Sequence, residues 1–202
     1  MDTKKLILEE TLKLMIEKDN SLISIREISA TSGIAIGGIY YYFSTKEEIY
    51  DEIIERYLID YFKFNIDKLR QINGNAKEKI HDVMAEIFKQ KEIGIEIESI
   101  DEEIDYRFIL LILTAKGFAY ENYLKSLHIA LNELREFFTE IIEEGQKNRQ
   151  IRQDIPSKDI AESLILIYSG IQYNWDVYLI DDMISSFEDS FELEWEKIRF
   201  KD

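Results

Sequence analysis

Apolar residues recur every three or four positions along most of this 202-residue chain, which is the spacing of one face of an α-helix. Helix-interrupting residues are rare, with one proline and eight glycines. No segment shows the strict alternation or turn signals of a β-hairpin. The pattern therefore predicts an all-α protein. The expected helices span about residues 3–18, 25–32, 36–43, 46–72, 76–91, 102–114, 117–148, 157–180 and 183–199.

The helix expected to begin near Ile25 has clear signals at both ends. Ser24 is followed three residues later by Glu27, the spacing of a capping box, in which each side chain satisfies a backbone donor of the other residue. Gly33 can adopt the left-handed conformation that ends a helix and turns the chain. The sequence therefore predicts a short helix followed by a tight turn.

A second capping box is predicted where Ser44 precedes Glu47, so that only residues 36–43 remain for the helix between the turn and this cap. A short helix, a turn and another short helix are typical of a helix-turn-helix. In that motif the second helix enters the major groove of DNA. We therefore interpret residues 36–43 as a candidate recognition helix.

Three consecutive tyrosines give this candidate helix groups that can contact DNA. Phenolic hydroxyls can bond phosphate oxygens, and Lys46 adds a positive charge at the start of the next helix. Because successive helical residues turn by about 100°, Tyr41 and Tyr42 cannot both face inward together with Tyr40 and Phe43. We expect Phe43 in the core and at least one of Tyr41 and Tyr42 to be exposed.

The run IREISATSGIAIGGIYYYFSTKEEI resembles the DNA-binding signature of the TetR family of bacterial transcriptional repressors. The resemblance implies an all-α chain with an N-terminal three-helix helix-turn-helix DNA-binding domain at residues 1–47. A larger C-terminal helical ligand-binding and dimerisation domain would then occupy residues 48–202. The residues that carry the resemblance are Ile28, Ser29, Gly33, Ile39, Tyr40, Phe43, Lys46 and Glu47.

The chain departs from the family's common pattern at three positions. Serine is common where this chain has Ala35, a polar or basic residue at Ile36, and threonine at Gly38. Much of the contact with DNA must then come from the tyrosines, Lys46 and the backbone. The motif and the resemblance together predict DNA contacts at Arg26, Ala35, Ile36, Gly37, Gly38, Tyr40, Tyr41, Tyr42 and Lys46.

The net charge of −16 is opposite in sign to that expected of a nucleic-acid-binding protein. Its distribution is uneven, however, because the only ionised residues between positions 21 and 46 are Arg26, Glu27 and Lys46. The candidate DNA face is thus nearly free of acids. We expect tight binding to a specific site, with weak non-specific affinity that is lost as salt rises.

Cysteine is absent, which excludes disulfides and thiolate metal sites and fits a reducing cytoplasm. Glu9 and Glu10 interrupt anything like the apolar region of a signal peptide. No apolar run approaches the length of a membrane span. We therefore expect a cytoplasmic protein with no membrane partner.

The helix expected at about residues 157–180 is apolar around too much of its circumference to lie on the surface of a monomer. A second subunit is the expected cover. The TetR resemblance implies that this helix and the one at about 183–199 form a four-helix interface in a homodimer. Two recognition helices would then meet a palindromic operator.

Aromatic residues are dense in the middle and late helices, where the resemblance implies a small-molecule site. A structural role in the core is the alternative for each of them. We expect a lipophilic aromatic inducer or, because of Glu121, a cationic one. The predicted ligand-binding residues are Tyr106, Phe118, Tyr120, Glu121, Tyr123, Tyr168, Gln172 and Trp175.

An enzyme is the main alternative class. Glu78 and His81 have the E-x-x-H spacing of di-iron helical bundles, but such sites need a second copy, and Lys125 stands where His128 would require a glutamate. We therefore expect no enzymatic activity, no cofactor and no metal site, although carboxylate chemistry remains open. A helical adaptor that binds only protein is another alternative, but it gives no use for exposed tyrosines.

The pattern and the resemblance together favour a ligand-responsive repressor. Its inducer would stabilise a state in which the two recognition helices are spaced wrongly for successive major grooves.

Overall fold

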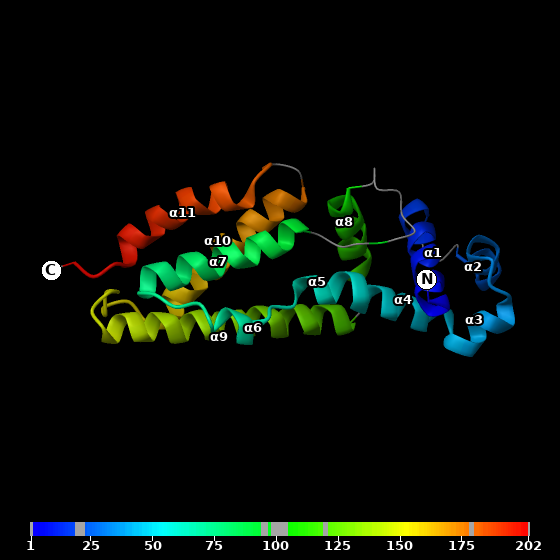
Figure 1. Cartoon of the computed structure of the whole chain (residues 1–202), viewed down its shortest axis with the longest axis horizontal. Helices are drawn as coiled ribbons and strands as arrows, with labels where there is room; N and C mark the ends of the chain where they lie inside the picture. Colours follow the sequence, from blue (N-terminus) through cyan, green and yellow to red (C-terminus); the bar gives the residue numbers. More distant parts are fainter. Residues whose placement is uncertain are drawn as a thin grey trace. The chain divides into compact units, whose positions relative to one another are not determined.

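The computed structural model describes residues 2–18, 23–93, 97, 105–118, 121–177 and 180–201. Helices make up nearly all of the regular structure in these segments, as Figure 1 shows, and the predicted all-α fold class is confirmed. The isolated β-bridge between Ile151 and Arg199 is the only strand-like pairing in the same segments. No helix in the described part of the chain is both long and apolar enough to cross a bilayer.

The chain divides into two compact units. The first comprises Met1–Tyr61 and Ile95–Lys125, and the second comprises Phe62–Gly94 and Ser126–Asp202. The domain limits expected from the sequence, 1–47 and 48–202, stay a prediction.

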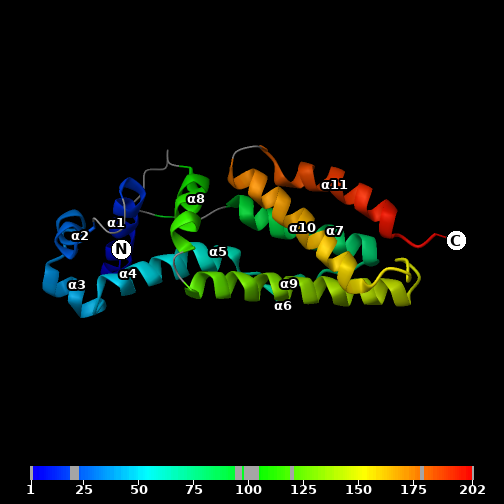
Figure 2. The ribbon, with the colours of Figure 1, turned by 180° about the vertical axis from the view of Figure 1, so that it is seen from behind.

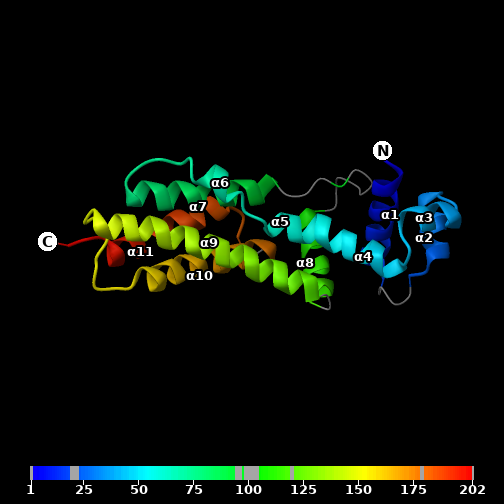
Figure 3. The same cartoon turned by 90° about the horizontal axis from the view of Figure 1, so that it is seen from below.

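The first unit begins with four helices around one apolar centre. They are α1 (Thr3–Glu17), α2 (Ile25–Ser32), α3 (Ile36–Tyr42) and α4 (Lys46–Ile54). Helix α1 packs against both α2 and α4, and α3 packs against α2, as can be followed in Figure 3. Their fully buried apolar side chains, all aliphatic or thioether, include Ile7, Leu8, Leu12, Met15, Ile28, Ile39, Ile49 and Ile53.

A π-helical turn, η2 (Glu55–Ile59), follows α4 directly and leads into α5 (Asp60–Phe62). The wider turn, in which the amide of Asp60 bonds to the carbonyl of Glu55, lets three consecutive side chains face inward. Tyr57, Leu58 and Ile59 are all buried. Helix α8 (Tyr106–Gly117) packs against η2.

The single helix predicted for residues 46–72 is wrong, because the chain leaves helical geometry at residues 63–65. Asn65 provides the reason for the new start, since its side-chain oxygen accepts a hydrogen bond from the amide of Lys68 and caps α6 (Ile66–Leu69). The apolar spacing that suggested one helix persists across this break, so periodicity alone does not reveal it.

The second unit is built mainly from α7 (Ala76–Ile93), α9 (Glu121–Lys147), α10 (Ser157–Asp176) and α11 (Met183–Ile198). Helices α7 and α10 each pack against α11, as Figures 1 and 2 show. Their apolar faces form one cluster that includes stacked rings from Phe88 and Tyr168. The predicted helices at 102–114 and 117–148 begin later than expected, at Tyr106 and Glu121, and residues 102–104 lie outside the described part.

Candidate functional site

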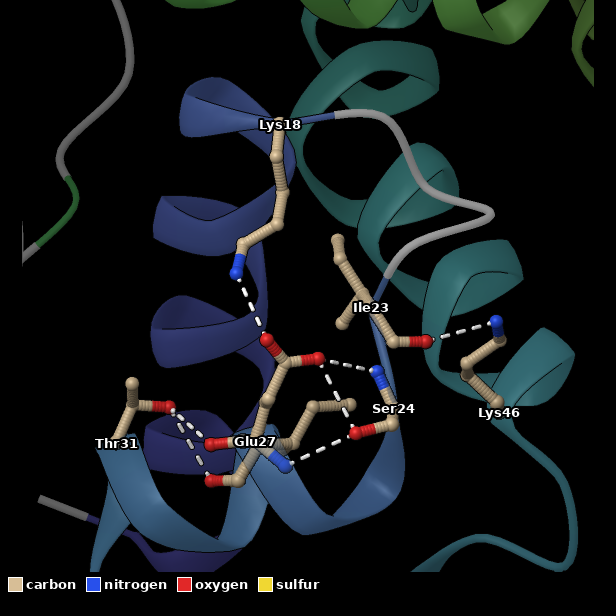
Figure 4. A network of polar contacts seen from close by, with 7 residues as sticks. Lys18, Ile23, Ser24, Glu27, Thr31 and Lys46 are labelled. Carbon is tan, nitrogen blue, oxygen red and sulfur yellow. Dashed lines mark hydrogen bonds and ion pairs between the residues drawn. The ribbon is translucent and has the colours of Figure 1, made fainter.

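The helix-turn-helix begins with the predicted capping box, which is confirmed. The amide of Ser24 donates to Glu27 Oε2 at 2.9 Å, and the amide of Glu27 donates to Ser24 Oγ at 3.3 Å. Glu27 also accepts a hydrogen bond from Lys18 Nζ at 2.9 Å, which ties the end of α1 to the start of α2, as Figure 4 shows. The bond from Lys18, followed by those from Ser24, lowers the pKa of the Glu27 carboxyl.

The turn after α2 depends on one glycine and two serine hydroxyls. Gly33 has φ of +70°, and a Cβ there would meet nothing within 4 Å, so the requirement is conformational and not steric. Ser29 Oγ donates to the carbonyl oxygen of Ile34 at 2.7 Å, and Ser32 Oγ donates to that of Ile28 at 2.6 Å. The predicted turn is therefore confirmed, and short-range hydrogen bonds fix its direction.

Helix α3 is held in the unit by one buried side chain, that of Ile39. Phe43, directly after the helix, is buried as predicted, whereas Tyr40 is 52% exposed. Tyr41 is 82% exposed and makes an edge-on contact with Tyr42, the ring centroids being 5.0 Å apart. All three tyrosines and Ile36 therefore present surface to solvent.

The capping box predicted at Ser44 and Glu47 is wrong by one residue. Thr45 is the N-cap of α4, and its hydroxyl accepts a hydrogen bond from the amide of Glu48 at 3.1 Å. The amide of Ser44 donates to Glu48 Oε2 at 2.6 Å. Serine and threonine can both cap a helix, so the backbone path decides between these neighbours.

Lys46, at the first position of α4, has a structural contact within the motif. Its Nζ donates to the carbonyl oxygen of Ile23 at 2.9 Å and lies 5.4 Å from the centre of the Tyr50 ring. Figure 4 shows this bond connecting α4 with the residue before the α2 cap. Arg26 is exposed on the first turn of α2. The predicted roles of both residues in binding DNA stay predictions.

An acidic hollow of about 410 Å³ lies beside the last turn of α3. Tyr42 and Phe43 form part of its wall, and the remainder includes the carboxylates of Glu48, Asp51, Glu52 and Glu55. These carboxylates repel phosphate on that side. Helix α3 itself, IGGIYYY, contains no acidic or basic side chain.

The predicted ligand-binding residues are divided between the two units. In the first unit, Tyr106 is half-buried, Phe118 and Glu121 are exposed, and Tyr123 is buried with its ring edge-on to Phe118. A Cβ at Gly117 would lie 3.0 Å from the Tyr123 ring, which shows that Tyr123 packs tightly there. Tyr123 is therefore packed in the core of the unit, and its predicted contact with a ligand stays a prediction.

In the second unit, Tyr168 and Gln172 are buried on α10, and Trp175 is half-buried one turn later. The amide of Gln172 donates from Nε2 to Asp176 Oδ1 at 2.9 Å. Tyr120, which also belongs to the predicted set, lies outside the described residues.

A buried lysine in the second unit escaped the sequence-based prediction. Lys91 is only 4% exposed, and its Nζ lies 5.5 Å and 5.2 Å from the ring centres of Phe62 and Phe64. Burial lowers its pKa to about 7, although the charge of Asp176 opposes that shift. The sequence pattern could have indicated this burial, because Lys91 lies at helical spacing from Ile80, Met84 and Ile87 on the apolar face of α7.

Tyr168 and this lysine both pack against the ring of Phe64. The Phe64 ring is edge-on to the Tyr168 ring at 5.7 Å. The Tyr168 hydroxyl is buried and has no hydrogen-bond partner in the described part of the chain. Burial, and then the charge of Asp176, raise its pKa. We call Lys91, Phe62, Phe64, Tyr168 and Asp176 the Lys91 cluster.

The residues that suggested a di-iron enzyme have separate contacts. The Glu78 carboxylate accepts a hydrogen bond from the amide of Asn75 at 2.9 Å at the start of α7. His81 Nδ1 lies 2.9 Å from Asp82 Oδ1, and its ring packs near Phe187. Within the described segments, no three histidine, aspartate or glutamate side chains are grouped to hold a metal ion.

A family model matches the amino-terminal part of the chain. Residues 7–53 match the family model for bacterial regulatory proteins of the tetR family. No match was found among curated protein sequences.

Solved structures of transcription regulators share the fold over nearly the whole chain. A TetR transcription regulator from Haloarcula marismortui has a TM-score of 0.64 at 15% identity, with 98% of each chain covered. NalD, the secondary repressor of the MexAB-OprM multidrug efflux pump in Pseudomonas aeruginosa, has a TM-score of 0.67 at 15% identity, with 98% of this chain and 95% of that chain covered.

The ketosteroid transcriptional regulator KstR2 of Mycobacterium tuberculosis has a TM-score of 0.56 at 14% identity, covering 99% of this chain and 96% of that chain. At such low sequence identities, the similarity to solved structures shows only the fold. The family model is separate evidence, because it matches the sequence of residues 7–53, which include the helix-turn-helix. Residues 7–53 therefore match the tetR family model, in a chain that has the fold of solved transcription regulators.

Proposed function

We propose that this chain is a ligand-responsive transcriptional repressor that binds a palindromic operator as a homodimer and releases it when a small molecule binds. The observation that carries the proposal is the exposed face of α3. Hydrogen bonds fix the ends of α2 in the helix-turn-helix. Tyr40, Tyr41 and Tyr42 are nevertheless exposed, although burying their rings would be favourable. Contact with DNA gives these side chains a use.

The DNA-contacting set remains the one predicted from the sequence. Exposed phenolic hydroxyls on α3 would bond phosphate oxygens and base edges, and Lys46 and Arg26 would add positive charge on the flanking helices. The net charge of −16 and the acidic hollow beside Tyr42 disfavour non-specific binding. Specific affinity would thus depend on two correctly spaced copies of the motif.

The proposed dimer would form through α10 and α11. Leu166 and Tyr173 are exposed seven residues apart on α10, and Leu193 is exposed on α11. Residues seven apart lie on the same side of a helix, so Leu166 and Tyr173 share an apolar face. A second copy of the chain would remove this face from water and place two α3 helices on one operator.

The Lys91 cluster is the proposed site where a small molecule acts in the second unit. A buried hydroxyl without a partner costs about 1–3 kcal/mol, which a ligand oxygen that accepts from Tyr168 would recover. The phenyl rings of Phe62, Phe64 and Phe88 would receive a lipophilic or aromatic body. Binding would favour the state that fits the operator poorly, which requires different affinities for the two states.

The first test of the proposed function is selection of operators from random DNA by the purified chain, followed by titration of the selected duplex. Tyr41→Phe should weaken binding roughly tenfold, because it removes a hydroxyl bond to a charged phosphate and keeps the ring. Lys46→Ala should weaken binding at least as much, whereas Lys125→Ala, a change to an exposed lysine on α9, should not.

Lys46→Ala also removes the bond to Ile23, so its thermal unfolding must be measured beside its affinity. Unchanged affinity in both Tyr41→Phe and Lys46→Ala would show that the DNA-binding surface is assigned wrongly. Failure to select any common sequence would count against the proposed function as a whole.

A further inference from the structure

We infer that the first turn of α3 recognises T·A base pairs, with Ile36 packing against the 5-methyl group of thymine in the major groove. The inference rests on the proposed function and names the class of base pair that this recognition helix reads.

The side chains of α3 exclude the commonest forms of direct readout. Guanine is usually read by bidentate arginine or lysine, and adenine by bidentate asparagine or glutamine. Helix α3 has the sequence IGGIYYY and contains none of these residue types. Its only polar side-chain groups are tyrosine hydroxyls, and its remaining exposed side chain is the aliphatic one of Ile36.

Ile36 lies where a recognition helix meets base edges. It is the first residue of α3, and the residues near the amino-terminal end of such a helix contact the bases. The fold buries Ile39 completely but leaves Ile36 40% exposed, so the core of the unit does not use it fully. The thymine methyl is the apolar group that a base pair presents in the major groove, and it is the natural contact for an aliphatic side chain.

The two glycines that follow Ile36 differ in whether packing inside the unit explains the absence of a side chain. A Cβ at Gly38 would lie 3.0 Å from Ile34 Cγ2, so packing inside the unit disfavours a larger residue there. A Cβ at Gly37 would meet nothing within 4 Å, and nothing in the described part of the unit requires its absence. Since glycine lowers helix propensity relative to alanine, Gly37 has a cost that the fold does not explain.

Close approach of DNA to the first turn of α3 would explain the glycine at position 37. Without a side chain at that position, the backbone of α3 can approach the edges of the bases closely. This approach would bring the side chain of Ile36 into contact with a methyl group in the groove. Exposure of Ile36 and open space at Gly37 are thus two separate observations that favour one arrangement.

The test compares thymine with uracil, which differ only by the 5-methyl group, in an operator selected from random DNA. Each half-site should contain a thymine whose replacement by uracil weakens wild-type binding about fourfold, the equivalent of about 0.8 kcal/mol for one buried methyl-sized group. Cytosine at that position should weaken binding further, and 5-methylcytosine should recover part of the loss.

Variants then assign the methyl contact to Ile36. In Ile36→Ala, the ratio of affinities for thymine and uracil duplexes should fall from about four to about one, while Ile36→Val should keep most of the ratio. Gly37→Ala should leave thermal unfolding unchanged or improved and should weaken binding to both duplexes. These changes are at exposed positions, so loss of folding does not explain the expected pattern.

A selected operator without any uracil-sensitive position would overturn the inference and leave the proposed function intact. So would a ratio of about four that persists in Ile36→Ala, because another group would then contact the methyl. If no operator is selected at all, both the inference and the proposed function fail.

Discussion

The helix-turn-helix of the first unit and the interior of the second satisfy their polar groups in different ways. Around α2 and α3, the capping and turn hydroxyls are bonded within a few residues, as Ser24 is to Glu27 and Ser32 to Ile28. Two lysines, Lys18 and Lys46, add bonds of longer range. In the second unit, Lys91 and Tyr168 come from different helices, are buried, and owe their surroundings to tertiary packing. Local chemistry therefore specifies the motif, whereas long-range packing specifies the interior.

The two regions also differ in how many apolar contacts hold each helix. Helix α3 buries only Ile39, and two glycines weaken its intrinsic stability. Helix α10 buries seven side chains and has no comparable single point of attachment. A short helix whose exposed face must remain available to a partner can bury few residues, so its position depends strongly on its one anchor.

The largest expected effect is from truncating this anchor. Ile39→Ala and Leu164→Ala both shorten fully buried side chains and should each cost about 2–5 kcal/mol of the free energy of unfolding. Only Ile39→Ala should release a whole helix and abolish operator binding. Hydrogen exchange measures the release directly: unchanged protection of the amides of residues 39–43 in Ile39→Ala would show that α3 has other attachments.

Replacing the buried lysine should stabilise the second unit in a pH-dependent manner. Between the folded pKa of Lys91, about 7, and its ordinary value of 10.5, the unfolded chain binds more protons, so wild-type stability rises with pH. Lys91→Met removes this dependence. Its advantage over the wild type should be largest below pH 7, roughly 2–5 kcal/mol, and should shrink toward pH 10.5.

Denaturant unfolding from pH 6 to pH 10 checks this prediction, with Lys125→Met as the control for an exposed lysine. The control should show a constant difference from the wild type. Parallel stability curves for wild type and Lys91→Met would contradict the depressed pKa of the buried amine.

The smallest expected effects distinguish the two ends of the helix-turn-helix. Ser24→Ala and Thr45→Ala should each cost about 1 kcal/mol, because each removes a hydroxyl that caps a helix. Ser44→Ala should change stability by less than about 0.5 kcal/mol, since the Ser44 backbone amide, not its hydroxyl, bonds to Glu48. Thermal unfolding of the three variants would test the position of the cap; equal losses for Ser44→Ala and Thr45→Ala would contradict it.

Features specified by neighbouring residues could be predicted from the sequence. The capping box at Ser24, the turn at Gly33 and the buried position of Phe43 follow from local chemistry and helical geometry. The predicted cap of α4, Ser44, differs by one residue from the observed cap, Thr45, because both residues have a hydroxyl that can cap a helix. Local patterns of this kind identify an element more reliably than they identify its first residue.

Features that depend on distant residues could not be predicted in the same way. The burial of Lys91 results from Phe62 and Phe64, which precede α7 in the chain. Phe62 ends α5, and Phe64 lies within the break that the apolar period conceals. The aromatic residues chosen as ligand contacts were selected by type, and type does not separate a core residue such as Tyr123 from one with an unsatisfied hydroxyl such as Tyr168.

The π-helical turn η2 has a consequence for aligning this chain with its relatives. A π-turn accommodates one residue more than an α-helical turn, and here the extra residue allows Tyr57, Leu58 and Ile59 to be buried in succession. A relative whose corresponding helix is α-helical throughout would need a one-residue gap within positions 55–59. An ungapped alignment would pair every later core position of that helix with a neighbour of its true equivalent, and would make matched cores look unrelated.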